Sequence, residues 1–175
     1  SIIDEAMKAG GDKDIGHDYN TDIATRYEES LRKTVKTGWE VIDDMADGGL
    51  GAGELGVFVA PAGIGKSWGL VNVAANAVKA GKTVVHYTLE LNQAYVGLRF
   101  DSVFTGIAAQ NLKFHKDDVE KQVKKIKGQL IVKYFPTKGA TVNTLRAHID
   151  KCTVQGHKPD MIIVDYADLL RGNGK

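Results

Sequence analysis

The chain has 175 residues, enough for one domain with a substantial core and too few for two domains of ordinary size. Its 23 basic and 22 acidic side chains nearly balance, so no overall field attracts nucleic acid or a membrane surface, and any polyanion contact must be local. The single cysteine, Cys152, excludes an internal disulfide, and no apolar run approaches the roughly 18 residues of a membrane span. We therefore expect a soluble, cytoplasmic protein: one domain with an N-terminal appendage.

Residues 1–36 are predicted to form a connector and a linker helix. Glycines interrupt the polar segment 1–19, so we expect a short helix there at most. Apolar residues recur every four positions between Asn20 and Val35, which predicts a helix with a narrow apolar stripe of Ile23, Tyr27 and Leu31. That stripe could pack on this chain's own core or on a neighbouring subunit, and the sequence does not distinguish the two.

Residues 37–175 are predicted to form the core, which begins with irregular structure. A brief helical turn is expected at 41–45, and several glycines follow it up to Gly56. Three carboxylates lie close together here: Asp43, Asp44 and Asp47. We interpret them as a solvated rim and a helix cap rather than as a metal site.

A glycine-rich segment between a strand pattern and a helix pattern predicts a phosphate-binding loop. The apolar run 57–59 has the length and β-branched content of a buried strand. Apolar residues then recur at helical spacing after Ser67, and Gly81 stands where a helix commonly ends. The segment between them, with the residue that follows it, is Ala60, Pro61, Ala62, Gly63, Ile64, Gly65, Lys66, Ser67 and Trp68. We expect all nine to contact a nucleotide, ATP or another NTP, bound with Mg²⁺.

The chemistry of this loop follows from its residue types. Gly63 and Gly65 allow positive φ and close backbone approach, so successive N–H groups can surround a polyphosphate. Lys66 would reach the β- and γ-phosphates, and the Ser67 hydroxyl would bind Mg²⁺. The chain departs from the strict motif at two positions. Position 60 is alanine instead of glycine. Position 68 is tryptophan instead of the common hydroxyl residue, so an α-phosphate contact at Trp68 must use the Trp68 backbone N–H. The alternative is a glycine-rich turn that precedes a helix and binds nothing.

A second strand is predicted at 83–88, and Glu90 follows its carboxyl end. In open α/β sheets ligands lie outside the carboxyl ends of the strands, so Glu90 is expected beside the phosphate loop, where a carboxylate can orient and deprotonate water. Position alone favours the alternative that Glu90 is a first-turn glutamate of the next helix, where the helix dipole stabilises it. We interpret His86 as a strand residue, because no second histidine or cysteine lies at metal-binding spacing.

The rest of the chain alternates helices and strands. Helices are predicted at about 93–104, at 117–127 and from a Thr141 cap to about 156, and strands at 130–135 and 161–165. The lysines of 117–127 indicate a solvated face more than a nucleic-acid patch. Asp165 ends an apolar strand about a hundred residues after the phosphate loop, where it can hold Mg²⁺ through water. The alternation predicts an α/β fold, mostly a parallel sheet with helices on both faces.

Several segments together resemble the RecA-like ATPase domain of DnaB-type hexameric replicative DNA helicases, especially those of phages. They span about Thr37 to Leu170 in the order seen in that family. Besides the phosphate loop, the matching segments are Thr37-Gly38-Trp39 with Ile42-Asp43, Gly48-Gly49-Leu50 with Gly53-Glu54-Leu55, Tyr87 to Leu91, Arg99-Phe100, and Ile163 to Tyr166.

The resemblance implies roles for several of the matching residues. Glu90 corresponds to the catalytic base, Lys66 and Ser67 to the Walker A pair, and Asp165 to the Walker B aspartate. The Asn20 to Val35 segment corresponds to a linker helix that docks on the next subunit of a hexameric ring. The family often has a glutamine where this chain has Asp168, so no phosphate-sensing amide is assigned there.

The resemblance also implies a P-loop NTPase core that is incomplete at its C-terminus. The family places its strand-contacting loops, further core strands and an arginine finger after the position of Lys175. Single-stranded DNA would therefore bind mostly through regions outside this chain, and a primase or loader is an expected partner. The predicted function is the ATP-hydrolysing motor of a replicative helicase. The alternatives are a RecA-like recombinase or clock-type regulatory ATPase, and an assembly module that binds nucleotide without turnover.

Overall fold

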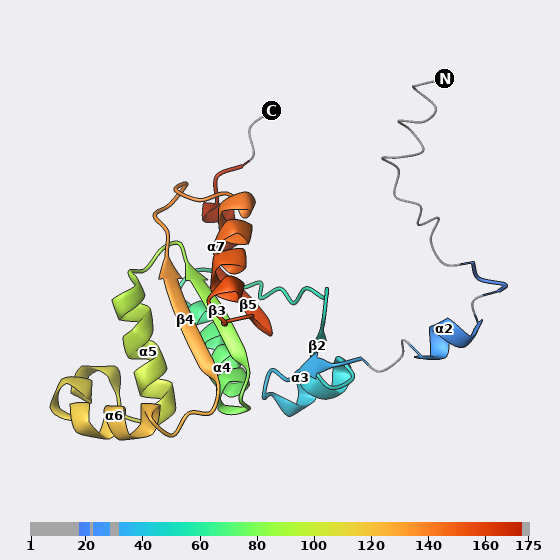
Figure 1. Ribbon diagram of the computed structural model, residues 1–175. Coiled ribbons are helices and arrows are strands. Elements are labelled where there is room, and N and C mark those ends of the chain that lie inside the picture. Colours follow the sequence, from blue (N-terminus) through green and yellow to red (C-terminus); the bar gives the residue numbers. More distant parts are fainter. Residues whose placement is uncertain (1–17, 22, 29–31, 173–175) are drawn as a thin grey trace. The chain divides into compact units, whose positions relative to one another are not determined.

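The computed structural model of the protein describes residues 18–21, 23–28 and 32–172 (Figure 1). The chain divides into two units, Ser1–Lys33 and Thr34–Lys175. In the first unit, helix α2 spans Ile23–Glu28, and its Ile23 and Tyr27 side chains are exposed. The helix predicted within 1–19 falls almost wholly outside the described residues, and so does Leu31.

The linker helix predicted to reach Val35 ends earlier. Thr34–Val35 form strand β1, which pairs antiparallel with β2, Leu50–Gly51. Both β1 residues are β-branched, which favours extended backbone over helix. The helical spacing of the preceding residues therefore does not extend to this point, and the second unit begins with a small antiparallel ladder that the sequence did not predict.

The core of the second unit is a parallel sheet. Its strands within the described range are β3 (Thr83–Thr88), β4 (Gln129–Tyr134) and β5 (Met161–Asp165), in the order β4-β3-β5. Thr88 pairs with Tyr134 on one side and with Asp165 on the other. The carboxyl ends of all three strands therefore lie along one edge, as the predicted α/β fold requires.

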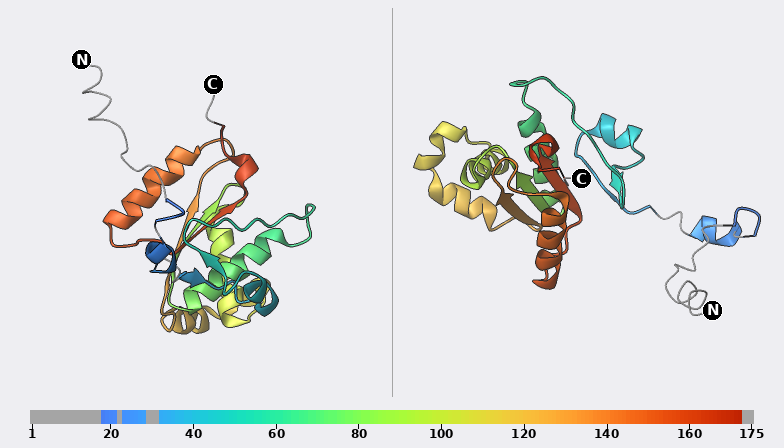
Figure 2. Two further views of the ribbon diagram at one scale, coloured as in Figure 1. Left: turned by 90° about the vertical axis from the view of Figure 1, so that its right-hand side faces the viewer. Right: turned by 90° about the horizontal axis from the view of Figure 1, so that it is seen from above.

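Helices cover both faces of this sheet (Figures 1 and 2). Helices α4 (Lys66–Lys79) and α5 (Gln93–Thr105) pack on one face, where Val84 joins their apolar cluster. Helix α7 (Val142–Val154), capped by Thr141 as predicted, packs on the other face, where Val85 and Tyr87 meet its Leu145. Because alternate β3 side chains point to opposite faces, a buried strand of this kind is apolar at nearly every position.

The remaining elements lie on the α5 side of the sheet or at its end. The 3₁₀ helix η1 (Ala109–Phe114) leads into α6, and the short 3₁₀ helix η2 (Ala167–Leu169) follows β5. Helix α6 spans Lys116–Val123, so the helix predicted to continue to residue 127 ends earlier, in turns. No helix in the described ranges combines the length and the apolar character that crossing a bilayer demands.

The strand predicted at 57–59 is not part of the sheet. This segment has no ladder partner among the described residues, and Val57 and Val59 are 69% and 91% exposed. Only Phe58 packs, edge-on against Trp39 with ring centroids 5.6 Å apart. An apolar β-branched run forms a strand only when a neighbouring strand bonds its backbone, and no described strand pairs with this segment.

The prediction that Asp43 forms part of a solvated rim is also wrong. Helix α3 spans Glu40–Met45, and the Asp43 side chain is buried at 6% exposure. Its carboxylate accepts hydrogen bonds from the Thr37 N–H at 2.7 Å, the Thr37 hydroxyl at 2.8 Å and the Gly38 N–H at 3.0 Å. Burial tends to raise the pKa of Asp43, but these bonds and the Lys36 charge lower it below its usual value.

The same loop is fastened to α4. The Asn76 side-chain amide of α4 donates to the Thr37 carbonyl at 2.9 Å. Gly38 lies so close to Asn76 that a Cβ at Gly38 would meet the amide nitrogen at 2.2 Å, and Gly38 has φ of +82°. Only glycine accommodates both the backbone conformation and the close approach. Asp43 and Asn76 thereby hold Trp39, and through it Phe58, against the first turns of α4, the helix that follows the predicted phosphate loop.

Candidate functional site

The predicted phosphate loop has the backbone conformation that its glycines allow. Gly63 and Gly65 have φ of +81° and +100°, both in the left-handed region, and Gly65 is the N-cap of α4. Lys66 begins the helix and Ser67 follows in its first turn. The unpaired N–H groups and positive dipole end of α4 are therefore presented at the loop, a local arrangement suited to an anion.

The rest of the loop is open to solvent. Ala60 is partly exposed, Pro61 and Ala62 are exposed, and Ile64 is 69% exposed. Around Gly63 and Gly65 there is no heavy atom of the described structure within 4 Å of where a Cβ would stand. The loop thus leaves space for a ligand beside its two left-handed residues, where backbone amides can approach phosphate oxygens.

Lys66 lies beside the end of β5. Its Nζ stands 4.7 Å from the centroid of the Tyr166 ring, a cation–π contact, and Tyr166 directly follows Asp165. The structure therefore brings the loop lysine to the strand end that carries the predicted Walker B carboxylate. Sequence reasoning did not assign a role to Tyr166, because no residue spacing indicates which aromatic ring a lysine will cover.

Asp165 is buried and only partly satisfied. The side chain is 4% exposed, and its Oδ1 has no hydrogen-bond partner in the described structure. Its position on β5 matches that of Met161 and Ile163, which face α4 and α5. A buried carboxylate oxygen without a donor is costly in an apolar setting, and a cation or a bound water would satisfy it.

Glu90 lies at the same edge of the sheet. The N–H of Leu89 donates to the Asp165 carbonyl at 2.9 Å, so the chain leaving β3 stays beside the end of β5. Glu90 comes next and is exposed. The following helix, α5, begins only at Gln93, and Asn92 caps it by accepting from the Ala94 N–H. Glu90 therefore precedes the N-cap of α5, which disfavours the alternative of a first-turn helix glutamate.

His86 lies beneath this edge on the α4 and α5 face of β3. It is fully buried, its ring meets Phe100 edge-on with centroids 5.6 Å apart, and neither ring nitrogen has a hydrogen-bond partner among the described groups. Burial lowers the pKa of His86 to about 4, while Asp165 acts to raise it and Arg99 to lower it. The imidazole is therefore neutral at physiological pH, and the interpretation of His86 as a strand residue agrees with its position.

The Trp68 side chain contacts Arg99 of α5. The Arg99 guanidinium carbon lies 5.3 Å from the centroid of the Trp68 ring. Stacking of a guanidinium on an indole fixes the ring against the second helix and leaves the Trp68 backbone at the loop. Arg99 belongs to a segment that carried the family resemblance, but a contact between two helices could not be inferred from its spacing.

The donor set fits a nucleotide with Mg²⁺. Within the described ranges no group of three or more His, Cys, Asp or Glu side chains could hold a metal by itself. Magnesium in phosphate-loop sites needs few protein ligands, because phosphate oxygens and waters complete its octahedron. The hydroxyl of Ser67 and the unsatisfied oxygen of Asp165 are the two protein groups that would bind the ion.

A separate cavity of about 710 Å³ lies between α5, η1 and α6 in the described structure, and none of the predicted site residues lines it.

Comparison with known proteins identifies the family and the fold of the chain. The sequence matches the family described as DnaB-like helicase C terminal domain over residues 34–175. One relative, the DnaB-like replicative helicase of Enterobacteria phage T4, is 28% identical over 181 residues, which cover 97% of this chain and 38% of the relative. The chain therefore spans less than half the length of that relative.

Two solved structures share the fold. One, described as an "ATPase Domain", has a TM-score of 0.69 and 17% identity, over 98% of this chain and 59% of its own. The other, described as "The Structure Of A DnaB-Like Replicative Helicase And Its Interactions With Primase", has a TM-score of 0.70 and 19% identity, over 99% of this chain and 45% of its own. Both confirm the predicted RecA-like α/β fold. Because the family model matches residues 34–175, which make up most of the chain, this chain belongs to the DnaB-like helicase C-terminal domain family.

Proposed function

We propose that this chain is the ATP-binding and ATP-hydrolysing motor core of a replicative DNA helicase that unwinds duplex DNA by moving along a single strand. The observation that carries the proposal is the contact of Lys66 with Tyr166, which joins the phosphate loop to the strand end bearing Asp165. Family membership supports the same reaction, since a helicase couples NTP hydrolysis to movement.

In this proposal the loop binds and neutralises the polyphosphate. Backbone N–H groups from Ala60 to Trp68 and the N-terminus of α4 surround the phosphates, which their partial positive charges favour. Lys66 leaves the Tyr166 ring for the β- and γ-phosphate oxygens, where its charge offsets the negative charge of the reacting group. Magnesium bound by Ser67, and through water by Asp165, would withdraw charge from the same oxygens.

Glu90 orients and deprotonates the attacking water. The residue is exposed at the carboxyl edge of the sheet, beside the chain that bonds the end of β5. An ionised carboxylate in this place accepts a water proton as the water approaches the γ-phosphate. The support for this role is position and family resemblance, and Glu90 thus supplies the general base while Lys66 supplies electrostatic stabilisation.

The test uses the longer protein that carries this chain, with Glu90→Gln and the exposed Glu40→Gln as a matched control. We expect Glu90→Gln to bind ATP normally while DNA-stimulated turnover falls by about 10²-fold or more, the usual contribution of a general base. Unwinding of a forked duplex should fall in parallel, and the control should keep both activities. Full turnover by Glu90→Gln would refute the assignment, and turnover without any unwinding would favour a recombinase or regulatory ATPase.

We further propose that the complete protein forms a homo-oligomer, a hexameric ring in which α2 docks on a neighbouring subunit. The exposure of Ile23 (53%) and Tyr27 (76%) on this six-residue helix supports an intermolecular role for its apolar stripe. Single-stranded DNA and a primase or loader are the expected partners. Light scattering of the longer protein should show that Ile23→Asp with Tyr27→Asp dissociates the oligomer, and an unchanged mass would contradict the docking role.

A further inference from the structure

No described residue holds the Glu90 carboxylate in place through its side chain. Glu90 is exposed, and its side chain takes part in no hydrogen bond or ion pair of the described structure. A general base must come within hydrogen-bond reach of the water that it deprotonates, about 2.6–3.2 Å. The position of Glu90 is therefore set by the backbone that carries it, residues 88–91, which we call the Glu90 turn.

The Thr88 hydroxyl closes the Glu90 turn. Thr88 is the last residue of β3, and its side chain is fully buried. Its hydroxyl donates to the Leu91 carbonyl at 2.7 Å and accepts from the Leu91 N–H at 3.2 Å. Threonine hydroxyls that bond nearby backbone groups in this way stabilise turns. Both bonds span Glu90, so together they fix the two ends of its turn.

The Leu89 backbone is held at both of its polar groups. Its N–H donates to the Asp165 carbonyl at 2.9 Å, and its carbonyl accepts from the Thr137 hydroxyl at 3.3 Å. The Leu89 side chain is fully buried, and Leu91 packs against the apolar cluster of α4 and α5. Glu90 is thus exposed between two anchored leucines, at the edge of the sheet where β5 ends.

We propose that the Thr88 hydroxyl, assisted by the Thr137 hydroxyl, positions Glu90 against the attacking water. The inference rests on the proposed function, in which Glu90 is the general base. Thr88 is a positioning residue, because its hydroxyl bonds the Leu91 backbone and acts on the reaction only through the turn. Displacement of a reacting group by about 1 Å can lower a rate by about 10²-fold, so loss of this hydroxyl slows the chemical step and leaves nucleotide binding intact.

The test compares Thr88→Val with Thr88→Ser in the longer protein that carries this chain. Valine has nearly the shape of threonine without the hydroxyl, whereas serine keeps the hydroxyl. We expect Thr88→Val to lower the kcat of DNA-stimulated ATP hydrolysis by roughly 10- to 100-fold with KM within about twofold, and Thr88→Ser to keep kcat within about threefold. Equal losses in the two variants would show that Thr88 acts by packing, and an unchanged kcat of Thr88→Val would remove the role.

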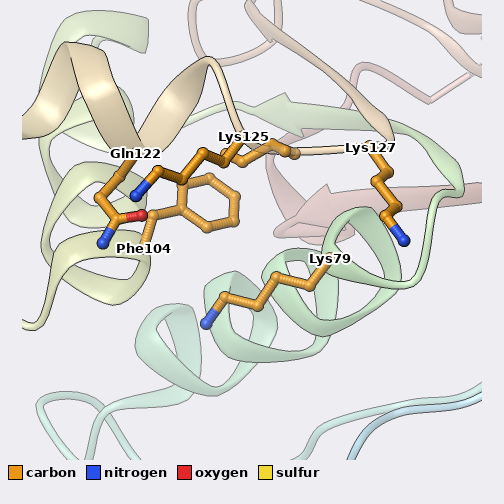
Figure 3. Close-up of a pocket in the computed structure, with 6 residues that line it drawn as sticks. Lys79, Phe104, Gln122, Lys125 and Lys127 are labelled. Atoms are coloured by element: carbon orange, nitrogen blue, oxygen red, sulfur yellow. The ribbon is translucent and has the colours of Figure 1, made fainter.

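Thr105 provides a matched control away from the nucleotide site. Its hydroxyl donates to the Asp101 carbonyl at 2.7 Å and accepts from the Ile107 N–H at 3.1 Å, the same pair of bonds that Thr88 makes. Thr105 follows Phe104, which lines a cavity of about 190 Å³ at the end of α4 opposite the phosphate loop (Figure 3). Thr105→Val should lower the urea midpoint as Thr88→Val does, while its kcat stays within about twofold. A kcat that falls with stability in both variants would overturn the proposal.

A double substitution separates the positioning role from the proposed function. If Thr88 acts only through Glu90, Thr88→Val with Glu90→Gln should have the kcat of Glu90→Gln alone, within about twofold. Losses that multiply would show that Thr88 acts independently of Glu90 and would overturn the proposal. Full activity of Thr88→Val beside an inactive Glu90→Gln refutes only the positioning role, whereas full turnover by Glu90→Gln refutes the proposed function itself.

Thr137→Val provides a second variant if Thr88→Val does not fold. Thr137 is exposed, so the substitution leaves the core unchanged. We expect kcat to fall by about two- to fivefold with KM unchanged, because the Leu89 carbonyl loses the hydrogen bond from this hydroxyl. An unchanged kcat would contradict the positioning of the Glu90 turn by the two hydroxyls.

Discussion

Asp165 combines burial with an unsatisfied oxygen, and this decides what its substitution should do. The side chain is 4% exposed and its Oδ1 lacks a partner in the described structure, which fits a group that acts through a cation or water. We expect Asp165→Asn to abolish the gain in ATP affinity that Mg²⁺ confers, while affinity without Mg²⁺ stays within a few-fold of the original. Calorimetric titrations with and without Mg²⁺ measure both, and an unchanged Mg²⁺ effect would exclude the metal-binding role.

His86 should make the fold sensitive to acid. Burial lowers its pKa to about 4 from 6.5, so between these values the unfolded chain binds a proton that the folded chain does not. Stability therefore falls as the pH is lowered through this window, by roughly 3 kcal/mol in total at about 1.36 kcal/mol per unit. The groups that face His86 are Phe100, Asp165 and Arg99, and only Asp165 opposes the loss.

The measurement is chemical denaturation of the chain and of His86→Leu between about pH 7 and pH 4.5, within the window where the imidazole titrates. We expect the variant to lose most of the pH dependence and to be at least as stable at neutral pH, because two unsatisfied buried nitrogens are removed. A residual slope is expected from His148, whose pKa burial and nearby lysines also lower. Superimposable pH profiles for the two proteins would contradict the role of His86.

At the scale of elements, the loop before α3 is held mainly by the Asp43 carboxylate. Asp43 accepts three hydrogen bonds from Thr37 and Gly38, and Asn76 of α4 bonds the same loop from the other side. Asp43→Ala leaves the Thr37 N–H and hydroxyl unsatisfied at a residue that is 5% exposed. We expect it to cost about 2–4 kcal/mol of unfolding free energy, against less than about 0.5 kcal/mol for the exposed Asp44→Ala.

Urea denaturation at neutral pH compares the two variants directly. Because the pKa of Asp43 is lowered, its contribution is fully present above pH 3.8 and is lost only as the pH falls below that value. The difference between the variants should therefore persist in mildly acidic buffer. Equal stabilities of Asp43→Ala and Asp44→Ala would show that the network does not hold the loop.

The helices and strands were predicted correctly where the apolar pattern of the sequence matches the burial in the structure. The strands at 83–88 and 161–165 were predicted with correct bounds, and α7 starts at its predicted Thr141 cap. The sequence pattern gave wrong predictions where tertiary contacts determine the local structure. The run 57–59 has strand-like residues but no described strand that pairs with it. In the sequence Asp43 looks like a surface aspartate, because its burial depends on a hydrogen bond with the Thr37 backbone.

At the scale of the whole molecule, the parallel sheet carries the site. Parallel pairing sets Thr88 beside Asp165, so Glu90 and Asp165 must emerge at one edge, and this much followed from the order of strands in the sequence. The contacts of Lys66 with Tyr166 and of Trp68 with Arg99 could not be predicted, because they join surfaces of different elements.

The central claim is that the loop from Ala60 to Trp68 binds Mg-ATP with Lys66 as its cation, and one titration tests it most directly. Isothermal calorimetry of Mg-ATP compares the unmodified chain with Lys66→Ala and with Lys151→Ala, which removes an exposed lysine on α7. A charge-assisted hydrogen bond is worth about 1.5–3 kcal/mol, so Lys66→Ala should weaken binding at least about tenfold while Lys151→Ala leaves it unchanged. Equal affinity of Lys66→Ala and the unmodified chain would contradict the account.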